Sequence, residues 1–249
     1  MGTRMREETE FRPKPMVEIG GRPVLWHIMK NLSLHGITEF VIACGYKGEY
    51  IKNYFLNYQA MNSDFTVRLD KRGDIRFHGE SMCEQWTVSV IDTGVGTMTG
   101  GRLGRLRDFV GAERFLCTYG DGLADVDVTS LIKFHESHGK LATITVTQPS
   151  SRFGIVEHDV AGVVHKFREK PQLDGHVNIG FFIFEAQALQ LMDGDDCVLE
   201  QGPLTSLTER AELAAFEHKG FWQPMDTYRE YQQLNQLWSS GVAPWKTWE

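Results

Sequence analysis

The chain has 249 residues, and 26 Lys and Arg against 33 Asp and Glu give a net charge of −7. This length suits one large α/β domain, and 41% hydrophobic with 24% charged residues is typical of a folded globular protein, which excludes a disordered chain or a coiled coil. The acidic balance argues against a nucleic-acid binder, which needs a basic excess to neutralise phosphates.

The apolar runs are too short to span a bilayer, and the charged N-terminus has no apolar segment behind it, so neither a membrane span nor a secretory signal is expected. The four cysteines are scattered and contain no C-x-x-C pair. They therefore argue against a disulfide framework or a zinc site, and we expect small buried thiols in a cytoplasmic protein.

Helical and strand patterns alternate through the first half of the chain. Apolar residues at helical spacing predict a helix over 23–34, and the β-rich run 39–44 is of the kind buried in a parallel sheet. The alternation predicts right-handed crossovers and a mainly parallel, doubly wound sheet. The same patterns predict helices over 47–58 and 127–138, and strands over 87–91, 114–118 and 141–147.

The second half has a more antiparallel pattern, in which turns separate short strands. Residues Ala243 to Glu249 carry Trp245 and Trp248, and the sequence leaves open whether these rings pack on the core or on another subunit. Ligands of open α/β sheets bind beyond the carboxyl ends of strands, so functional residues are expected just after predicted strands. The patterns predict strands over 155–157, 163–169 and 179–185, and helices over 187–192 and 228–239.

Near the N-terminus, Gly-Thr-Arg at 2–4 precedes Lys14, which stands between Pro13 and Pro15. Glycine N–H groups and Thr and Arg side chains suit a phosphate. The two prolines would hold the Lys14 ammonium on a stiff extended segment, where a cation can stabilise charge on a phosphoryl group. A solvated arm with a Pro-rich bend is an equally favoured alternative.

Two aspartates are candidates for a hard cation. Asp121 stands between two glycines directly after a predicted strand, and Asp226 precedes the helix predicted from Tyr228. Mg²⁺ is usually held by one or two carboxylates together with phosphate oxygens and water. The alternatives are a turn-forming Asp-Gly pair for Asp121 and a helix N-cap for Asp226.

Two more segments follow predicted strands. Glu169 could accept hydrogen bonds from sugar hydroxyls and Lys170 could bind a phosphate, although an exposed, charged strand end is the commoner meaning of such a run. Small residues around Thr97 and Gly101, followed by Arg102, would let a planar base lie against the backbone. The alternative there is a flexible glycine loop, which these residues alone favour.

Over essentially its whole length, the chain resembles the sugar-1-phosphate nucleotidyltransferases through G-T-R-M-R, R-P-K-P-M-V-E-I-G-G-R-P, M-T-G-G-R, Y-G-D-G, E-K-P and W-Q-P-M-D-T, in that order. The phrases L-W-H-I-M-K, G-Y-K-G, F-W-Q-P-M-D-T and A-P-W-K-T-W-E look like the branch that uses CTP and glucose 1-phosphate. The resemblance implies a Rossmann-like, doubly wound, mixed α/β sheet in one domain over 1–249. Residues 1–140 would be mainly nucleotide-binding, and 141–249 mainly sugar-binding and oligomer-forming.

The implied reaction converts CTP and α-D-glucose 1-phosphate to CDP-glucose and pyrophosphate, for dideoxyhexoses of bacterial cell-surface polysaccharide, in a homo-oligomer. The resemblance implies that Asp121 and Asp226 hold Mg²⁺, and that Lys14, Arg4 and Asp121 are catalytic. The implied nucleotide-binding residues are Gly2, Thr3, Arg4, Lys14, Thr97, Gly101, Arg102 and Gly120, and the implied sugar-phosphate residues are Glu169, Lys170, Asn178 and Gly180.

The chain departs from the family pattern at its start, which falls inside the glycine-loop motif. We therefore expect the family's first strand to be missing, with apolar neighbours and backbone groups left uncovered. At Asn178-Ile179-Gly180, relatives often carry two adjacent glycines. The alternatives are the same chemistry with another nucleotide, an inactive truncated paralogue, or a dinucleotide-dependent oxidoreductase, whose glycine pattern fits 94–101 poorly.

Overall fold

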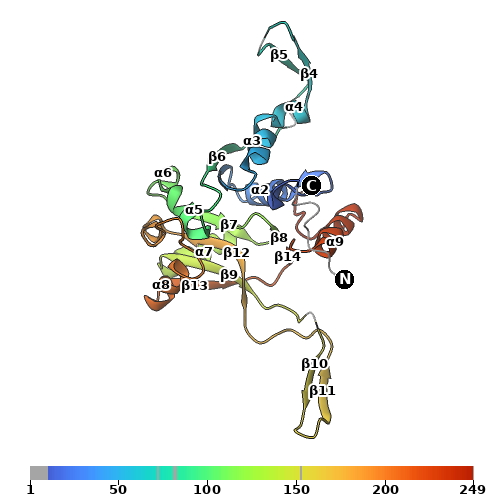
Figure 1. Cartoon of the computed structure of the whole chain (residues 1–249), viewed down its shortest axis with the longest axis vertical. Helices are drawn as coiled ribbons and strands as arrows, with labels where there is room; N and C mark the ends of the chain where they lie inside the picture. The colour runs from blue at the N-terminus through green and yellow to red at the C-terminus, as the bar shows by residue number, and fades with distance from the viewer. Residues whose placement is uncertain (1–10, 72, 81–82, 152, 249) are drawn as a thin grey trace.

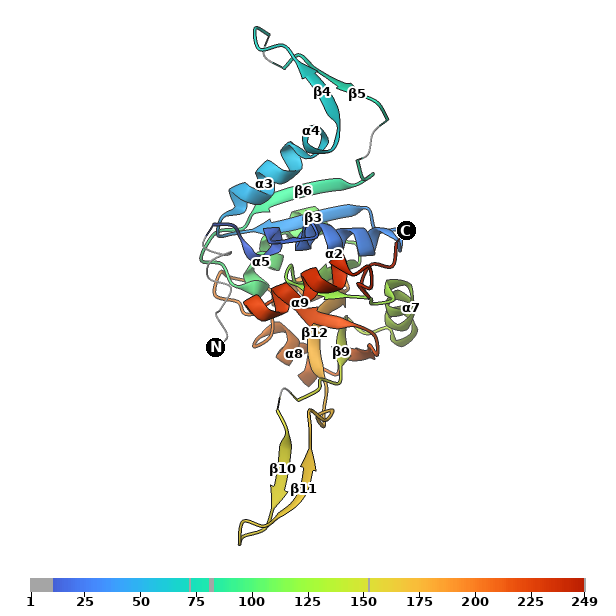
Figure 2. The same cartoon turned by 90° about the vertical axis from the view of Figure 1, so that its right-hand side faces the viewer.

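The computed structural model describes residues 11–71, 73–80, 83–151 and 153–248. It has a central α/β body from which two long arms project at opposite ends (Figures 1 and 2). The elements up to the first arm are η1 (Lys14–Met16), β1 (Glu18–Ile19), β2 (Arg22–Pro23), α2 (Val24–Ser33), β3 (Glu39–Cys44), α3 (Gly48–Leu56), α4 (Tyr58–Asn62), β4 (Asp64–Val67) and β5 (Ile75–His78).

The remaining elements form most of the body and the second arm. They are β6 (Thr87–Asp92), α5 (Thr99–Arg105), α6 (Arg107–Val110), β7 (Phe115–Thr118), β8 (Gly122–Ala124), α7 (Val128–His138), β9 (Ala142–Thr147), β10 (Ile155–His158), β11 (Val164–Arg168), β12 (Val177–Phe184), η2 (Ala186–Leu191), α8 (Pro203–Glu209), β13 (Leu213–Glu217), β14 (Trp222–Pro224) and α9 (Tyr228–Ser239).

The predicted helices and strands are present, with two corrections of type. The helix predicted over 187–192 is the 3₁₀ helix η2, which ends at Leu191, and not an α-helix. Thr99–Arg105 forms helix α5 where glycines favoured a loop. The sequence did not predict the β4–β5 arm or the strands β8, β13 and β14. These strands are three to five residues long, so their hydrophobic period is hard to detect.

The sheets are mixed, as the predicted fold class has it, although the parallel part expected for the first half is smaller than predicted. β3 and β6 form a parallel pair, and a separate four-stranded sheet has the order β13-β9-β12-β7. In that sheet only β9 and β13 run parallel, because β12 returns antiparallel to both β7 and β9. The α/β character and the mixed strand directions agree with the predicted fold class.

A groove of about 660 Å³ runs between β3 and β7 and is lined by residues along both strands. In the described part of the chain, β3 pairs only with β6 and β7 only with β12, so each strand has one open edge on this side. Val41, expected to be buried in a sheet, is therefore 39% exposed.

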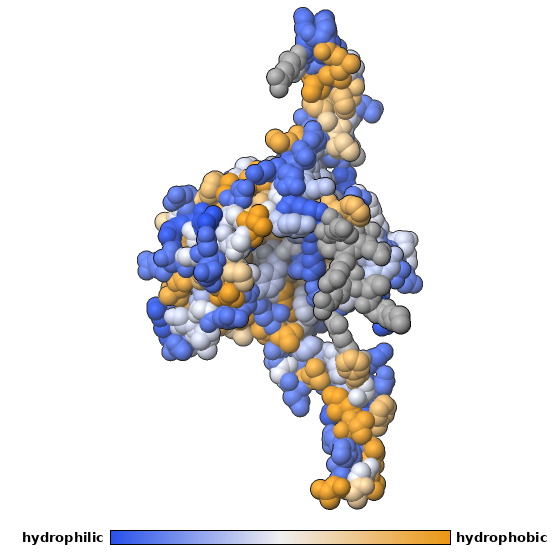
Figure 3. All heavy atoms as spheres, viewed as in Figure 1, coloured by the Kyte–Doolittle hydropathy of each residue, from blue (hydrophilic) through white to orange (hydrophobic). Residues whose placement is uncertain are grey.

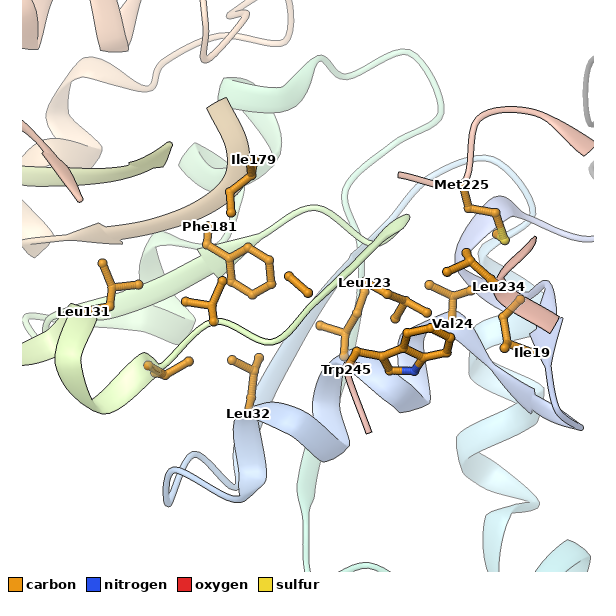
Figure 4. Packing of buried hydrophobic residues seen from close by; sticks show 14 of the residues in the cluster. Ile19, Val24, Leu32, Leu123, Leu131, Ile179, Phe181, Met225, Leu234 and Trp245 are labelled. Atoms are coloured by element: carbon orange, nitrogen blue, oxygen red, sulfur yellow. The ribbon is translucent and has the colours of Figure 1, made fainter. Parts of the chain in front are cut away.

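The main core lies where α2, α9 and the C-terminal tail meet β8 and β12 (Figure 4). Figure 4 shows Trp245 close to Leu123 and Val24, and its ring is fully buried. Trp245 also contacts the ring of Phe221 at 5.6 Å between centroids. The tail thus packs on the core of its own chain, which decides between the two alternatives that the sequence left open for Trp245.

His27 is a buried residue of α2 that is held in its neutral form. Its Nε2 lies 2.8 Å from the carbonyl oxygen of Ile19, and the Trp245 indole N–H points at its Nδ1 at 3.4 Å. Neutral imidazole can satisfy both contacts, as a donor at Nε2 and an acceptor at Nδ1. Burial is the main cause that lowers the pKa of His27 from 6.5 to about 4, although hydrogen bonds to backbone carbonyls oppose this shift.

We expect His27 to make the fold less stable as the pH falls from about 6.5 to about 4. In that window the unfolded chain binds a proton at His27 that the folded chain does not, so folding is penalised by up to about 3 kcal/mol at the acidic end. Urea unfolding of wild type and His27→Gln at several pH values measures the effect. The variant should lose less stability on acidification, and equal losses in both proteins would contradict the assignment.

Each projecting arm is a two-stranded ribbon with an apolar face. Cross-strand partners share a face, as do residues two apart, so one face of the β4–β5 arm carries Phe65, Phe77, Val67 and Ile75. On the β10–β11 arm, Val156 pairs with Phe167, and both are exposed. Figure 3 shows apolar surface on both arms. None of the helices in the described part of the chain has the length and apolar character needed to cross a bilayer.

Candidate active site

Lys14 lies at the start of η1, in a backbone held from both sides. Pro13 precedes it and Pro15 follows it, and the Met16 N–H donates to the Pro13 carbonyl at 2.8 Å. Met16 and Val17 are buried and anchor the segment. The sequence predicted a stiff support for Lys14, which the structure confirms, but the segment is a tight 3₁₀ turn and not extended.

The two aspartates meet through the pairing of β8 with β14. These strands are antiparallel, with Gly122 opposite Pro224, and the ladder continues by one hydrogen bond of 2.9 Å from the Met225 N–H to the Asp121 carbonyl. Asp121 precedes β8 and Asp226 follows β14, so both lie at the same end of the ladder. This register brings together carboxylates that are far apart in the chain.

The Lys14 ammonium lies between the two carboxylates. Its Nζ donates to Asp121 Oδ2 at 2.7 Å and to Asp226 Oδ1 at 2.5 Å, across 107 and 212 positions of the chain. Burial lowers the pKa of Lys14, but its hydrogen bonds to the two carboxylates and their negative charge outweigh burial, so the net pKa is raised. The ammonium is therefore charged at neutral pH. All three residues are among the predicted site residues.

The structure excludes the N-cap alternative for Asp226. Thr227 caps α9, because its side chain accepts from the Glu230 N–H, and the Glu230 carboxylate accepts from the Thr227 N–H in return. The sequence signal for this capping box, T-Y-R-E, was present at 227–230. With the cap supplied by its neighbour, the Asp226 carboxylate points to Lys14. The Asp121 carboxylate also bonds Lys14 rather than a local turn.

A second network lies beside the first and includes residues that the sequence did not single out. The Tyr119 hydroxyl donates to Glu200, which also accepts from Thr99 Oγ1 at 2.9 Å. The Tyr119 ring lies against Gly180, where a Cβ would come within 2.3 Å of Cδ2, and Gly180 has a φ of +84°. Only glycine suits this position. Tyr119 belongs to the Y-G-D-G motif at 119–122, whereas no sequence pattern pointed to Glu200.

The predicted nucleotide-binding residues around α5 are packed against protein. A Cβ on Gly101 would lie 2.5 Å from the Gly194 carbonyl oxygen, so the glycine permits close packing of the segment after η2. Arg102 donates to Thr93 Oγ1 at 2.7 Å and to the Cys44 carbonyl at 3.1 Å. Thr97 is buried. These contacts give the three residues structural roles, and their nucleotide-binding role stays a prediction.

The other predicted residues are placed as follows. Gly120 lies against Pro15, and Asn178 accepts from the Gly180 N–H at 2.8 Å, next to Tyr119. Glu169 and Lys170 are exposed at the base of the β10–β11 arm. Within the described ranges, no hydrogen bond or ion pair joins them to the Lys14 cluster. Gly2, Thr3 and Arg4 lie outside the described residues.

The Lys14 cluster fits a cation shared with a phosphate-bearing ligand. Asp121 and Asp226 converge on one positively charged atom, which shows that their oxygen atoms can face a common cation. In the part of the chain that the structure describes, no group of three or more His, Cys, Asp or Glu is placed to hold a metal. Mg²⁺ bound by two carboxylates would complete its octahedral shell with phosphate oxygens and water.

Comparison with known proteins places the chain in a family. The family model "nucleotidyl transferase" matches residues 1–227. A glucose-1-phosphate cytidylyltransferase of Salmonella typhi is 51% identical over 252 residues, which cover 100% of this chain and 96% of the relative.

Solved structures share the fold at low sequence identity. UDP-glucose pyrophosphorylase from Acinetobacter baumanii matches with a TM-score of 0.66 at 17% identity, over 97% of this chain and 92% of the other. HddC from Yersinia pseudotuberculosis matches with a TM-score of 0.65 at 20% identity, over 96% and 95%. The sequence matches, over most of the length and at this identity, show that the chain belongs to the nucleotidyl transferase family.

Proposed function

We propose that this protein transfers the cytidylyl group of CTP to α-D-glucose 1-phosphate and releases pyrophosphate. The observation that carries the proposal is the convergence of Lys14, Asp121 and Asp226 from three distant parts of the chain. Support for the two substrates comes from the 51% identity to a glucose-1-phosphate cytidylyltransferase, together with the sequence phrases typical of that branch.

The reaction needs charge neutralisation more than acid–base catalysis. A phosphate oxygen of glucose 1-phosphate attacks the α-phosphorus of CTP in line, and the bond from that phosphorus to the bridging oxygen breaks as pyrophosphate leaves with the electron pair. The attacking group is already an anion, so no general base is required. The protein must hold two mutually repelling anions together and stabilise the charge that develops.

Each residue of the cluster has a proposed part in this step. Asp121 and Asp226 would hold Mg²⁺, which when bound supplies positive charge to the phosphate oxygens. Lys14 would neutralise the α-phosphate, and its fixed backbone keeps the side chain anchored beside the site. Arg4 with Thr3 would bind the leaving pyrophosphate, and Gly2 would contact the nucleotide.

The nucleotide and the sugar phosphate would bind on either side of this cluster. Thr97, Gly101, Arg102 and Gly120 would line the nucleotide side. Glu169, Lys170, Asn178 and Gly180 would bind the sugar phosphate. Glu169 and Lys170 directly follow β11, where the arm returns toward the body of the protein.

The proposal includes a cytoplasmic homo-oligomer whose CDP-glucose supplies dideoxyhexose synthesis for cell-surface polysaccharide. Support for an oligomer comes from the apolar arm faces, since an isolated two-stranded ribbon is only marginally stable in water. Burial of these faces against other copies would stabilise the arms. Support for the product's use comes from the family resemblance.

Pyrophosphate release by the purified chain tests the function. With glucose 1-phosphate and Mg²⁺ present, CTP, UTP, dTTP and GTP are compared side by side, and we expect release with CTP well above the others. Omission of the sugar phosphate is the control, since pyrophosphate must then stay at background.

Two outcomes would change the proposal. Release with another nucleotide in preference to CTP would keep the chemistry and overturn the choice of base. No release with any of the four, from a protein that unfolds cooperatively, would favour the inactive paralogue.

A further inference from the structure

We propose that Lys14 is the built-in counter-ion of Asp121 and Asp226 in the ligand-free protein, so that a divalent cation enters this pair only together with the nucleotide, which draws the ammonium away. The inference rests on the proposed function for the metal and the nucleotide. It adds the order in which the divalent cation and the nucleotide reach the two carboxylates.

The positions of the three charges carry the first step. The Lys14 ammonium donates to both carboxylates at once, at 2.7 Å and 2.5 Å, and so stands at the point where their oxygen atoms converge. A divalent cation bound by the same oxygen atoms would stand beside a like charge. Half-buried surroundings strengthen this repulsion relative to bulk water, since the Lys14 side chain is only 28% exposed.

The second step concerns the number of ligands. This site offers two carboxylates, and no cluster of three metal-binding side chains is found in the described ranges. With Lys14 in place, the three side chains carry a net charge of −1, which attracts a divalent cation weakly. A nucleotide adds phosphate oxygens as ligands and gives the ammonium a new anionic partner, so it removes both obstacles together.

The third step is how Lys14 can move. Its backbone is held by Pro13, Pro15 and the buried Val17, so the main chain of η1 is not expected to shift. The flexible side chain can swing the ammonium from a carboxylate to a phosphate while the backbone stays in place. One residue therefore neutralises the acidic pair before binding and the nucleotide after binding.

Titration with Mn²⁺ in the absence of nucleotide tests this directly, with free Mn²⁺ followed by electron paramagnetic resonance. We expect Lys14→Gln to bind one Mn²⁺ about 10-fold more tightly than wild type, or better, because the pair then carries −2. Lys14→Arg keeps the charge and should bind like wild type. Lys30→Gln is the matched control, because Lys30 pairs with Glu84 at 2.7 Å away from this site.

Addition of CTP should raise the Mn²⁺ affinity of the two proteins by different amounts. CTP should tighten Mn²⁺ binding more in wild type than in Lys14→Gln, since only wild type has an ammonium to transfer to the phosphates. The gain seen in Lys14→Gln should disappear in the double variant Lys14→Gln/Asp226→Asn, which places the ion at the acidic pair.

Several results would overturn the inference. One is a Mn²⁺ affinity of Lys14→Gln that is no higher than that of wild type. Another is a gain in Mn²⁺ affinity that persists in the double variant. A third is wild-type Mn²⁺ binding that is equally tight with and without CTP. This third measurement uses only the wild-type protein, so it does not depend on whether a variant folds. Pyrophosphate release by wild type is measured separately, so that active enzyme with unchanged Mn²⁺ affinity refutes the exchange alone, whereas inactivity with all nucleotides refutes the function.

Discussion

Asp121→Asn and Asp226→Asn are each expected to lower the turnover of CTP and glucose 1-phosphate by about 10²–10³-fold, by analogy with the loss of one fixed electrostatic group. Both substitutions keep the shape of the side chain and remove the charge that faces Lys14. Thermal unfolding should change little, because the Asp226 side chain is 57% exposed and the capping of α9 depends on Thr227. Pyrophosphate release and calorimetry measure the two effects.

Asp108→Asn is the control for these variants. Asp108 is exposed on α6, so loss of its charge should leave turnover unchanged. Near-normal turnover by either purified active-site variant would contradict a metal-binding role for that aspartate. A large drop in unfolding temperature with the same loss of turnover would instead point to damage of the β8–β14 region.

Trp245→Ala is expected to lower the free energy of unfolding by about 3–5 kcal/mol, as found for large aromatic residues truncated in cores. Trp245 is fully buried among α2, β8 and α9, and its indole N–H points at His27 Nδ1. Truncation therefore creates a cavity and removes a donor from a buried acceptor. This loss is a large share of the 5–15 kcal/mol that typically stabilises a domain. Urea unfolding at pH 7 measures it.

Trp248→Ala provides the comparison within the same tail. Trp248 is only partly buried, so its truncation should cost clearly less than that of Trp245. The loss of unfolding free energy in Trp245→Phe should be smaller than in Trp245→Ala but not zero, because phenylalanine keeps much of the packing and lacks the indole N–H. A cost below about 1 kcal/mol for Trp245→Ala, the range of mild surface changes, would show that the tail is not part of the core.

Elements set by neighbours in the chain could be predicted from the sequence. The helix at 228–239 and the strand at 39–44 have the predicted bounds, because hydrophobic period and capping residues act within a few positions. The cation and carboxylates of the site were also identifiable, since Lys14 between prolines and Asp121 between glycines are local patterns.

Strand directions and long-range contacts needed the tertiary structure. The turn-separated pattern predicted antiparallel strands in the second half, but it did not show that β12 pairs with both β7 and β9, which were predicted as strands of the parallel part. Gly101 looked like part of a nucleotide loop but lies against the carbonyl of Gly194, which is 93 positions further along the chain (194 − 101 = 93). Sequence patterns do not connect residues at that separation. Glu200 had no signal, because its contacts with Tyr119 and Thr99 arise only when distant segments pack.

The sequence by itself determined which side chains are available for phosphate chemistry, the helices and strands that support them, and through its motifs the family. Only the tertiary structure decided that Lys14, Asp121 and Asp226 form one cluster, that Thr227 and not Asp226 caps α9, and that Trp245 completes the core. The physical reason is range. Period, turn and capping preferences act over a few residues, whereas this cluster depends on the β8–β14 register, which joins positions about a hundred residues apart in the chain (222 − 124 = 98).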